Sequence, residues 1–173
     1  VTPEQFSLTE LAEIVFRKQN VHPGAELVVS IAQDLIVADL SAMRMVLDEL
    51  FRNAITHHPS PSTLQIHIES STAMGAGTLI VVRDNGNGVP DGMLTKIAQP
   101  FVKLSTNGKS AGLGLSIISR ELEAMGAQLQ FRAGGGGLSA VIVLPAHMTA
   151  THDDRRPAIE PLDSQSAPKL RIV

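Results

Sequence analysis

The chain has 173 residues, of which 43% are hydrophobic and 18% charged, enough for one core of ordinary domain size. Its formal net charge of −3 argues against a nucleic-acid partner, and the absence of Cys excludes disulfides and thiolate metal sites. No apolar run reaches the roughly eighteen residues that span a bilayer, and no signal peptide is recognisable. We therefore expect a cytoplasmic domain without direct membrane insertion.

The first forty residues predict one helix and two strands. Ser7 and Glu10 have the spacing of a capping box, which opens a helix running to about Lys18. Residues 25–32 and 35–38 are short runs of strand-forming residues.

A second helix is predicted from about Ser41. Its apolar residues recur at i, i+3, i+4, i+7 and i+11, a stripe that packs on a sheet: Met43, Val46, Leu47, Leu50 and Ala54. Pro59 and Pro61 end this helix.

The remaining elements complete an α+β domain. Residues 63–70 alternate between polar and apolar side chains, which indicates a half-buried strand, and the apolar run 78–83 indicates a central one. A helix over 113–125, with Gly126 at its end, is followed by a glycine-linked hairpin of 127–132 and 138–144. Between them, the stretch 86–111 is predicted to be mostly loop, with a helical turn or two around 91–98. We expect one mixed sheet with about three helices on one face, a two-layer sandwich of roughly 145 residues.

Three groups of residues suggest chemistry, and the first follows the central strand. Asp84 is expected at the end of this strand, and the sequence Asn-Gly86-Asn-Gly88-Val-Pro90 follows it. A carboxylate there could accept a hydrogen bond from the exocyclic amine of adenine, and the two glycines remove the Cβ atoms that would keep a base away. The alternative is an ordinary Asn-Gly hairpin turn.

The second group, Gly112-Leu113-Gly114-Leu115, opens the third helix. The free N–H groups and positive dipole end of a helix favour phosphate binding. A Gly-x-Gly before a helix is weak evidence by itself, and the string matches neither a P-loop nor a dinucleotide fingerprint.

The third group is Glu49 and Asn53, which share one face of the second helix. A carboxylate and an amide oxygen are suitable ligands for Mg²⁺. The alternative is a solvated pair on the flank of the helix.

In their order along the chain, these strings resemble the N, G1, F and G2 boxes of sensor histidine kinases: 49–54, 84–90, 99–103 and 112–117. Such kinases belong to the GHKL superfamily, with gyrase, MutL and the large heat-shock chaperone. The resemblance covers about Phe6 to Pro145.

The resemblance implies the GHKL (Bergerat) ATP-binding fold, with ATP held between two helices under a lid formed by residues 94–110. It implies that the domain binds Mg-ATP and transfers the γ-phosphoryl group to a histidine on a separate phosphoacceptor helix. The residues that match family positions are Asp84 as the adenine reader, with Gly86 and Gly88 beside it; Asn53 as the Mg²⁺ ligand; Gly112, Leu113, Gly114 and Leu115 as the triphosphate cradle; His57 as a ring beside the nucleotide; and Lys103 as a basic residue of the lid.

The sequence departs from the family pattern in two places near the second helix. Glu49 stands where Asn is more frequent, and Thr56 stands where Lys is often found. In relatives that hydrolyse ATP, such a Glu polarises the attacking water. With a histidine acceptor, Glu49 is expected to help hold Mg²⁺ or the incoming imidazole, and Glu49 and Asn53 are the expected catalytic residues.

The remaining hypotheses concern the wider context. A conformational ATPase, a serine kinase of the anti-sigma type and a non-catalytic nucleotide-sensing adaptor are the alternative functions. None of the six His residues lies in a phosphoacceptor motif, so we expect the acceptor histidine on another segment. We expect the ATP-binding domain over residues 1–146 and a linker or tail over 147–173. Residues 169–173 resemble the first strand of a receiver domain, which predicts a hybrid kinase with a response-regulator receiver as partner.

Overall fold

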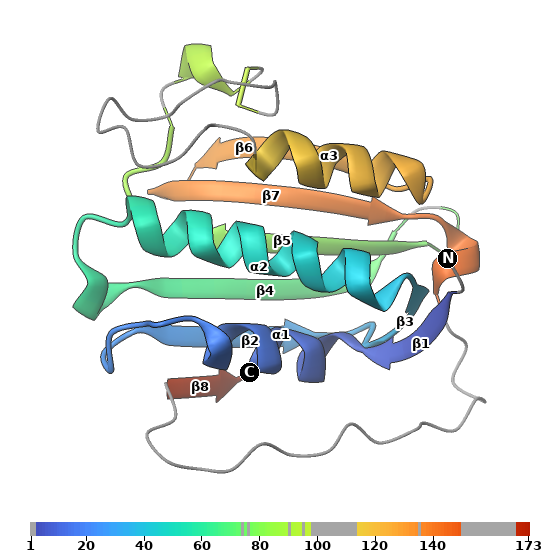
Figure 1. Cartoon of the computed structure of the whole chain (residues 1–173), viewed down its shortest axis with the longest axis horizontal. Coiled ribbons are helices and arrows are strands. Elements are labelled where there is room, and N and C mark those ends of the chain that lie inside the picture. Colours follow the sequence, from blue (N-terminus) through green and yellow to red (C-terminus); the bar gives the residue numbers. More distant parts are fainter. Residues whose placement is uncertain are drawn as a thin grey trace.

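Helices lie on one face of a mixed β-sheet in the computed structural model (Figure 1). The structure describes residues 3–73, 75, 77–89, 91–94, 96–97, 114–134, 136–149 and 169–173. Within these ranges the helices are α1 (Leu8–Lys18), α2 (Leu40–His57) and α3 (Gly114–Ala124). The strands are β1 (Glu4–Ser7), β2 (Glu26–Ile31), β3 (Leu35–Ala38), β4 (Gln65–Thr72), β5 (Thr78–Asp84), β6 (Gln128–Gly134), β7 (Gly137–Leu144) and β8 (Lys169–Ile172). Short 3₁₀ turns lie at Pro61–Thr63, Asp91–Met93 and Ala146–Met148.

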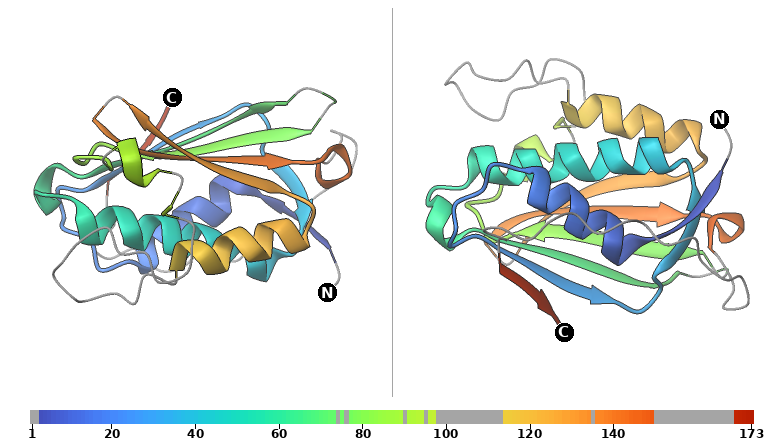
Figure 2. Two further views of the ribbon diagram at one scale, coloured as in Figure 1. Left: turned by 90° about the horizontal axis from the view of Figure 1, so that it is seen from above. Right: turned by 60° about the horizontal axis from the view of Figure 1, so that its bottom comes forward.

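The main sheet has the strand order β6-β7-β5-β4-β2-β8. Strand β2 runs parallel to β4 and to β8, and the other pairs are antiparallel, so the sheet is mixed as predicted. Figure 2 shows α1, α2 and α3 together on one side of it. The predicted two-layer α+β sandwich is therefore confirmed.

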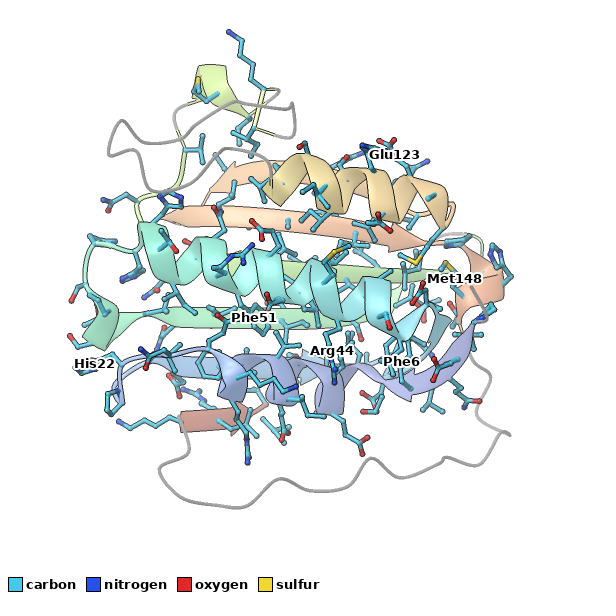
Figure 3. The ribbon with its side chains drawn as sticks, viewed as in Figure 1. Phe6, His22, Arg44, Phe51, Glu123 and Met148 are labelled. Atoms are coloured by element: carbon cyan, nitrogen blue, oxygen red, sulfur yellow. The ribbon has the colours of Figure 1, made fainter. Side chains whose placement is uncertain are left out.

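The apolar stripes of the helices form the layer between helices and sheet. All five stripe residues predicted on α2 are buried, with exposed fractions of 7% or less. Phe51 of α2 (labelled in Figure 3) is fully buried, and its ring meets that of Phe16 on α1 edge-on at 6.1 Å between centroids. Edge-to-face contact is a favourable aromatic geometry, and it fixes α2 against α1.

The predicted helix ends are confirmed by their caps. Ser7 Oγ accepts a hydrogen bond from the N–H of Glu10 at 3.1 Å and so begins α1. Gly126 follows α3 with φ of +80°, a conformation that costs glycine little. Asp39 caps α2 through the N–H of Ala42, so α2 begins one residue before the predicted start.

One pairing was not predicted. Strand β1 pairs antiparallel with β3 in a separate two-stranded sheet, so the expectation of a single sheet was wrong. The four residues of β1 are too few to show a strand periodicity. Their partner strand lies beyond α1 and β2 in the sequence, so no local sequence pattern predicts the pairing.

The chain continues to pack on the domain beyond Pro145. Met148 is 5% exposed, and the hydroxyl groups of Thr78 and Thr149 lie 2.8 Å apart. These contacts reach at least three residues beyond the predicted boundary at residue 146. Strand β8 lies beside β2 with Leu170 partly buried, and the extent of a separate linker or tail stays a prediction. No helix in the described ranges is long and apolar enough to cross a membrane.

Candidate functional site

Asp84 is the last residue of β5 and faces the helices. It is paired in register with Ile66, which is fully buried under them, and residues in register share a face of the sheet. Its Oδ1 accepts a hydrogen bond from the N–H of Gly86 at 2.8 Å. No described residue hydrogen-bonds its other carboxylate oxygen. The half-buried side chain can therefore accept a hydrogen bond from a ligand.

The loop after β5 needs glycine for steric reasons. A Cβ at Gly86, which is buried, would lie 2.8 Å from Asp84 Oδ1. Gly88 has φ of +68°, and a Cβ there would lie 3.1 Å from the carbonyl oxygen of Gly137. A Cβ at Gly137 would in turn collide with the backbone of Asp84. The backbone of β7 therefore approaches the loop more closely than any side chain would allow.

Asn85 anchors the same loop to β4, a role that the sequence analysis missed. Its Oδ1 accepts from the N–H of Gln65 at 2.7 Å, and its Nδ2 donates to the carbonyl oxygen of Thr63 at 2.9 Å. Its own N–H donates to the carbonyl oxygen of Gln65 at 3.2 Å. The Asn-Gly pair that suggested a hairpin turn instead ties two segments together.

Helix α2 contributes Glu49, Asn53 and His57. The side chain of Glu49 is 16% exposed, forms an ion pair with Arg52 and contacts the place where a Cβ of Gly114 would be. Asn53 is half-buried one turn further on, whereas His57 is exposed. The structure thus brings Glu49 to the start of α3 and leaves the His57 side chain in solvent.

Helix α3 begins at Gly114, and Leu115 is buried in the core at 7% exposure. Leu115 therefore fixes the first turn of α3 beside α2. Gly112, Leu113 and Lys103 lie outside the described residues, as does most of the predicted lid.

His58, which the sequence analysis passed over, lies closer to the loop than His57. A Cβ at Gly86 would lie 3.5 Å from His58 Cδ2. The sequence signal was its place directly after the helix, where Pro59 prevents further helical winding. Helix α2 therefore meets the Asp84 loop through His58 and the start of α3 through Glu49.

Glu49 and Asn53 carry oxygen atoms of the kind that Mg²⁺ prefers, and Glu49 Oε2 is paired with Arg52. Magnesium in nucleotide sites is held by one or two protein oxygens, with phosphate oxygens and water completing the octahedron. The described residues contain no cluster of three or more His, Asp or Glu that would hold a metal alone. A Mg²⁺ ion at these two residues would therefore need further ligands, such as phosphate oxygens and water.

Comparison with known proteins places residues 38–148 in the family model for histidine kinase-, DNA gyrase B- and HSP90-like ATPases. The alginate biosynthesis sensor protein KinB of Pseudomonas aeruginosa is 32% identical over 108 residues, which are 62% of this chain and 18% of that protein. The chain thus spans less than a fifth of that relative.

Two solved structures have the same fold. The catalytic domain of the histidine kinase ThkA is 24% identical, with a TM-score of 0.69 over 84% of this chain and 97% of that one. Full-length ShkA, in complex with AMPPNP, is 26% identical, with a TM-score of 0.72 over 87% of this chain and 32% of that one.

Proposed function

Because the chain belongs to the histidine kinase-, DNA gyrase B- and HSP90-like ATPase family, we propose that it binds Mg-ATP and transfers the γ-phosphoryl group to a histidine. The observation that carries the proposal is the position of α2 between two glycine-containing segments. One end of α2 contacts the Asp84 loop through His58, and its middle contacts the start of α3 through Glu49. A single ligand with a base at one end and phosphates at the other would lie along these contacts.

At the base end, Asp84 supplies the acceptor for the adenine amine. Its Oδ1 accepts a hydrogen bond from the N–H of Gly86, which restrains the carboxylate and leaves Oδ2 to the ligand. Glycine at 86 leaves the loop backbone open to a flat ring. Guanine presents an oxygen where adenine has the amine, so an ionised Asp84 would favour adenine.

At the phosphate end, the start of α3 supplies backbone N–H groups and the positive end of the helix dipole. Asn53, half-buried on α2, is the proposed Mg²⁺ ligand, and Glu49 lies one turn before it. When bound, Mg²⁺ would neutralise phosphate charge during transfer. The chain's own contribution is to position these groups, since phosphoryl transfer depends mainly on alignment and charge neutralisation.

The acceptor and further partners belong to the proposal as well. KinB is a longer sensor protein, and ShkA was solved with an ATP analogue, which supports a nucleotide-binding part within a larger kinase. We expect the acceptor histidine on a separate dimerisation and phosphoacceptor domain. A response-regulator receiver would take the phosphoryl group from that histidine.

The test is a transfer assay with γ-³²P-labelled ATP, Mg²⁺ and a panel of isolated histidine-bearing phosphoacceptor domains. We expect label on one of these domains that is lost in acid and stable in base, the behaviour of phosphohistidine. Acid-stable label would indicate a serine kinase. Release of phosphate without labelling of a protein would indicate an ATPase, and ATP binding with neither outcome would indicate an adaptor.

A further inference from the structure

His58 occupies a defined place at the end of α2. It is the residue that caps the helix, and its backbone N–H donates to the carbonyl oxygen of Ala54 at 3.0 Å. Its φ and ψ of −71° and 132° turn the chain out of the helix toward Pro59. The backbone therefore fixes the direction in which the side chain leaves the end of the helix.

One ring nitrogen of His58 is already used. Nδ1 accepts a hydrogen bond from the N–H of Ser60 at 3.1 Å. An accepting nitrogen has no proton, so in the neutral ring the proton resides on Nε2. The loop after α2 thus selects the tautomer whose Nε2–H is a donor.

That donor is buried without a partner. His58 Nε2 is shielded from solvent and has no hydrogen-bond partner among the residues that the structure describes. Burying an unpaired N–H is unfavourable, so this group calls for an acceptor that the described residues do not supply.

The donor edge of the ring lies at the Asp84 loop. Cδ2, which is bonded to Nε2, is 3.5 Å from the place where a Cβ of Gly86 would be. The N–H of Gly86 is bonded to Asp84 Oδ1 at 2.8 Å. A fixed acceptor, Asp84, and a fixed donor, His58, therefore flank the same glycine.

We propose that His58 is a base-binding residue of the nucleotide site, whose Nε2–H donates to a ring nitrogen of adenine. This inference rests on the proposed function. Adenine presents an amine donor and ring-nitrogen acceptors, and the pair of Asp84 and His58 offers the complementary acceptor and donor. His57, by contrast, is exposed.

Two substitutions test the roles of the two ring nitrogens of His58 separately. In His58→Asn, the amide oxygen can take the place of Nδ1 and keep the bond from Ser60, while the Nε2 donor is lost. In His58→Gln, the side-chain amide can reach the Nε2 position and donate, while the Nδ1 acceptor is lost. We expect the Kd for ATP, measured by calorimetry, to rise about three- to tenfold in His58→Asn and to change less than twofold in His58→Gln.

Analogues of ATP in which C–H replaces N1, N3 or N7 identify the acceptor atom. We expect the wild-type chain to bind one analogue about three- to tenfold more weakly than ATP, and His58→Asn to bind that analogue and ATP equally. If the ratio for every analogue is the same in both proteins, the inference is wrong. If the wild-type chain binds no ATP at all, the proposed function itself is wrong, and the inference about His58 is wrong with it.

A measurement on the unmutated chain covers the case in which His58→Asn does not fold. Nitrogen-15 NMR of the imidazole reports both the tautomer and the hydrogen bonding of each ring nitrogen. We expect protonated Nε2 in the free chain and a shift of that nitrogen and its proton when ATP binds. A proton on Nδ1, or an Nε2 signal unchanged at saturating ATP, would overturn the proposal.

Discussion

The side chain of Glu49 occupies the space into which a Cβ at Gly114 would project. Glu49 lies in the middle of α2, and Gly114 is the first residue of α3. The absence of one carbon atom at Gly114 therefore lets the carboxylate, held by Arg52, lie against the start of α3.

Gly114→Ala should weaken ATP binding through Glu49. Gly114 is the first residue of α3, where the preference of about 1 kcal/mol for alanine over glycine inside a helix applies only in part. The atoms that a methyl group would meet all belong to the Glu49 side chain, which can move, so the global stability should change little. The new methyl group should displace the Glu49 side chain and raise the Kd for ATP, as measured by calorimetry. In a Glu49→Ala background the same substitution should have a much smaller effect, because the displaced group is gone. An equal loss in both backgrounds would show that backbone access at residue 114 matters instead.

Asp84→Asn should reduce ATP affinity about ten- to hundredfold, the loss of one charge-assisted hydrogen bond of about 1.5–3 kcal/mol. If the amide oxygen keeps the bond from Gly86, the amide nitrogen faces the adenine amine, and two donors oppose each other. Circular dichroism should show an unchanged fold. Wild-type affinity in calorimetry would mean that the base binds elsewhere.

Asn53→Ala should abolish phosphotransfer and weaken ATP binding when Mg²⁺ is present. Binding in EDTA should be nearly unchanged, because the proposed role of Asn53 is to hold the metal. Calorimetry with and without Mg²⁺ measures the difference. A similar loss under both conditions would assign Asn53 a structural role.

Asn85→Ala should lower the free energy of unfolding by about 1–2 kcal/mol, since two side-chain hydrogen bonds to Thr63 and Gln65 are lost. Urea denaturation monitored by circular dichroism measures it. Asn87→Ala is the matched control, because Asn87 is exposed in the same loop, as Asn85 is, but makes no hydrogen bond with its side chain to any described residue. Equal stability of both variants would contradict the anchoring role.

His67→Gln should make the free energy of unfolding depend less on pH in the acid range. Burial lowers the pKa of His67 below its usual 6.5, and the guanidinium of Arg83, opposite it on β5, lowers that pKa further. The unfolded chain therefore binds a proton more readily than the folded one. The stability that neutral His67 gives to the folded chain is fully present above about pH 6.5. It is lost as the pH falls through the lower pKa of the folded state.

Thermal and urea unfolding between pH 5 and 8 test this expectation. The wild-type chain should lose more stability than His67→Gln as the pH falls below about 6.5. His22→Gln, a substitution in the turn after α1, serves as the control. Parallel curves for the wild-type chain and His67→Gln would contradict the expected role.

Much of the fold was predictable because its signals are local. A helix face is defined by residues three and four positions apart, so the stripe on α2 could be read directly. Helix ends are defined by one or two residues, such as Ser7 and Gly126. The family resemblance likewise rests on short strings, and the family match over residues 38–148 agrees with it.

The tertiary structure decided which groups meet. The sequence by itself placed Asp84 at the end of a strand and Glu49 on a helix, and the family resemblance placed Glu49 and Gly114 around the same phosphates. It did not predict the direct contacts of Glu49 with Gly114 and of His58 with Gly86. Those contacts join segments far apart in the chain, and they depend on how α2 packs against α3 and on where β5 ends beneath it. The difference between His57 and His58 depends on the turn at Pro59. There the backbone leaves the helix, so that His58 is half-buried with its Nε2 shielded while His57 stays exposed.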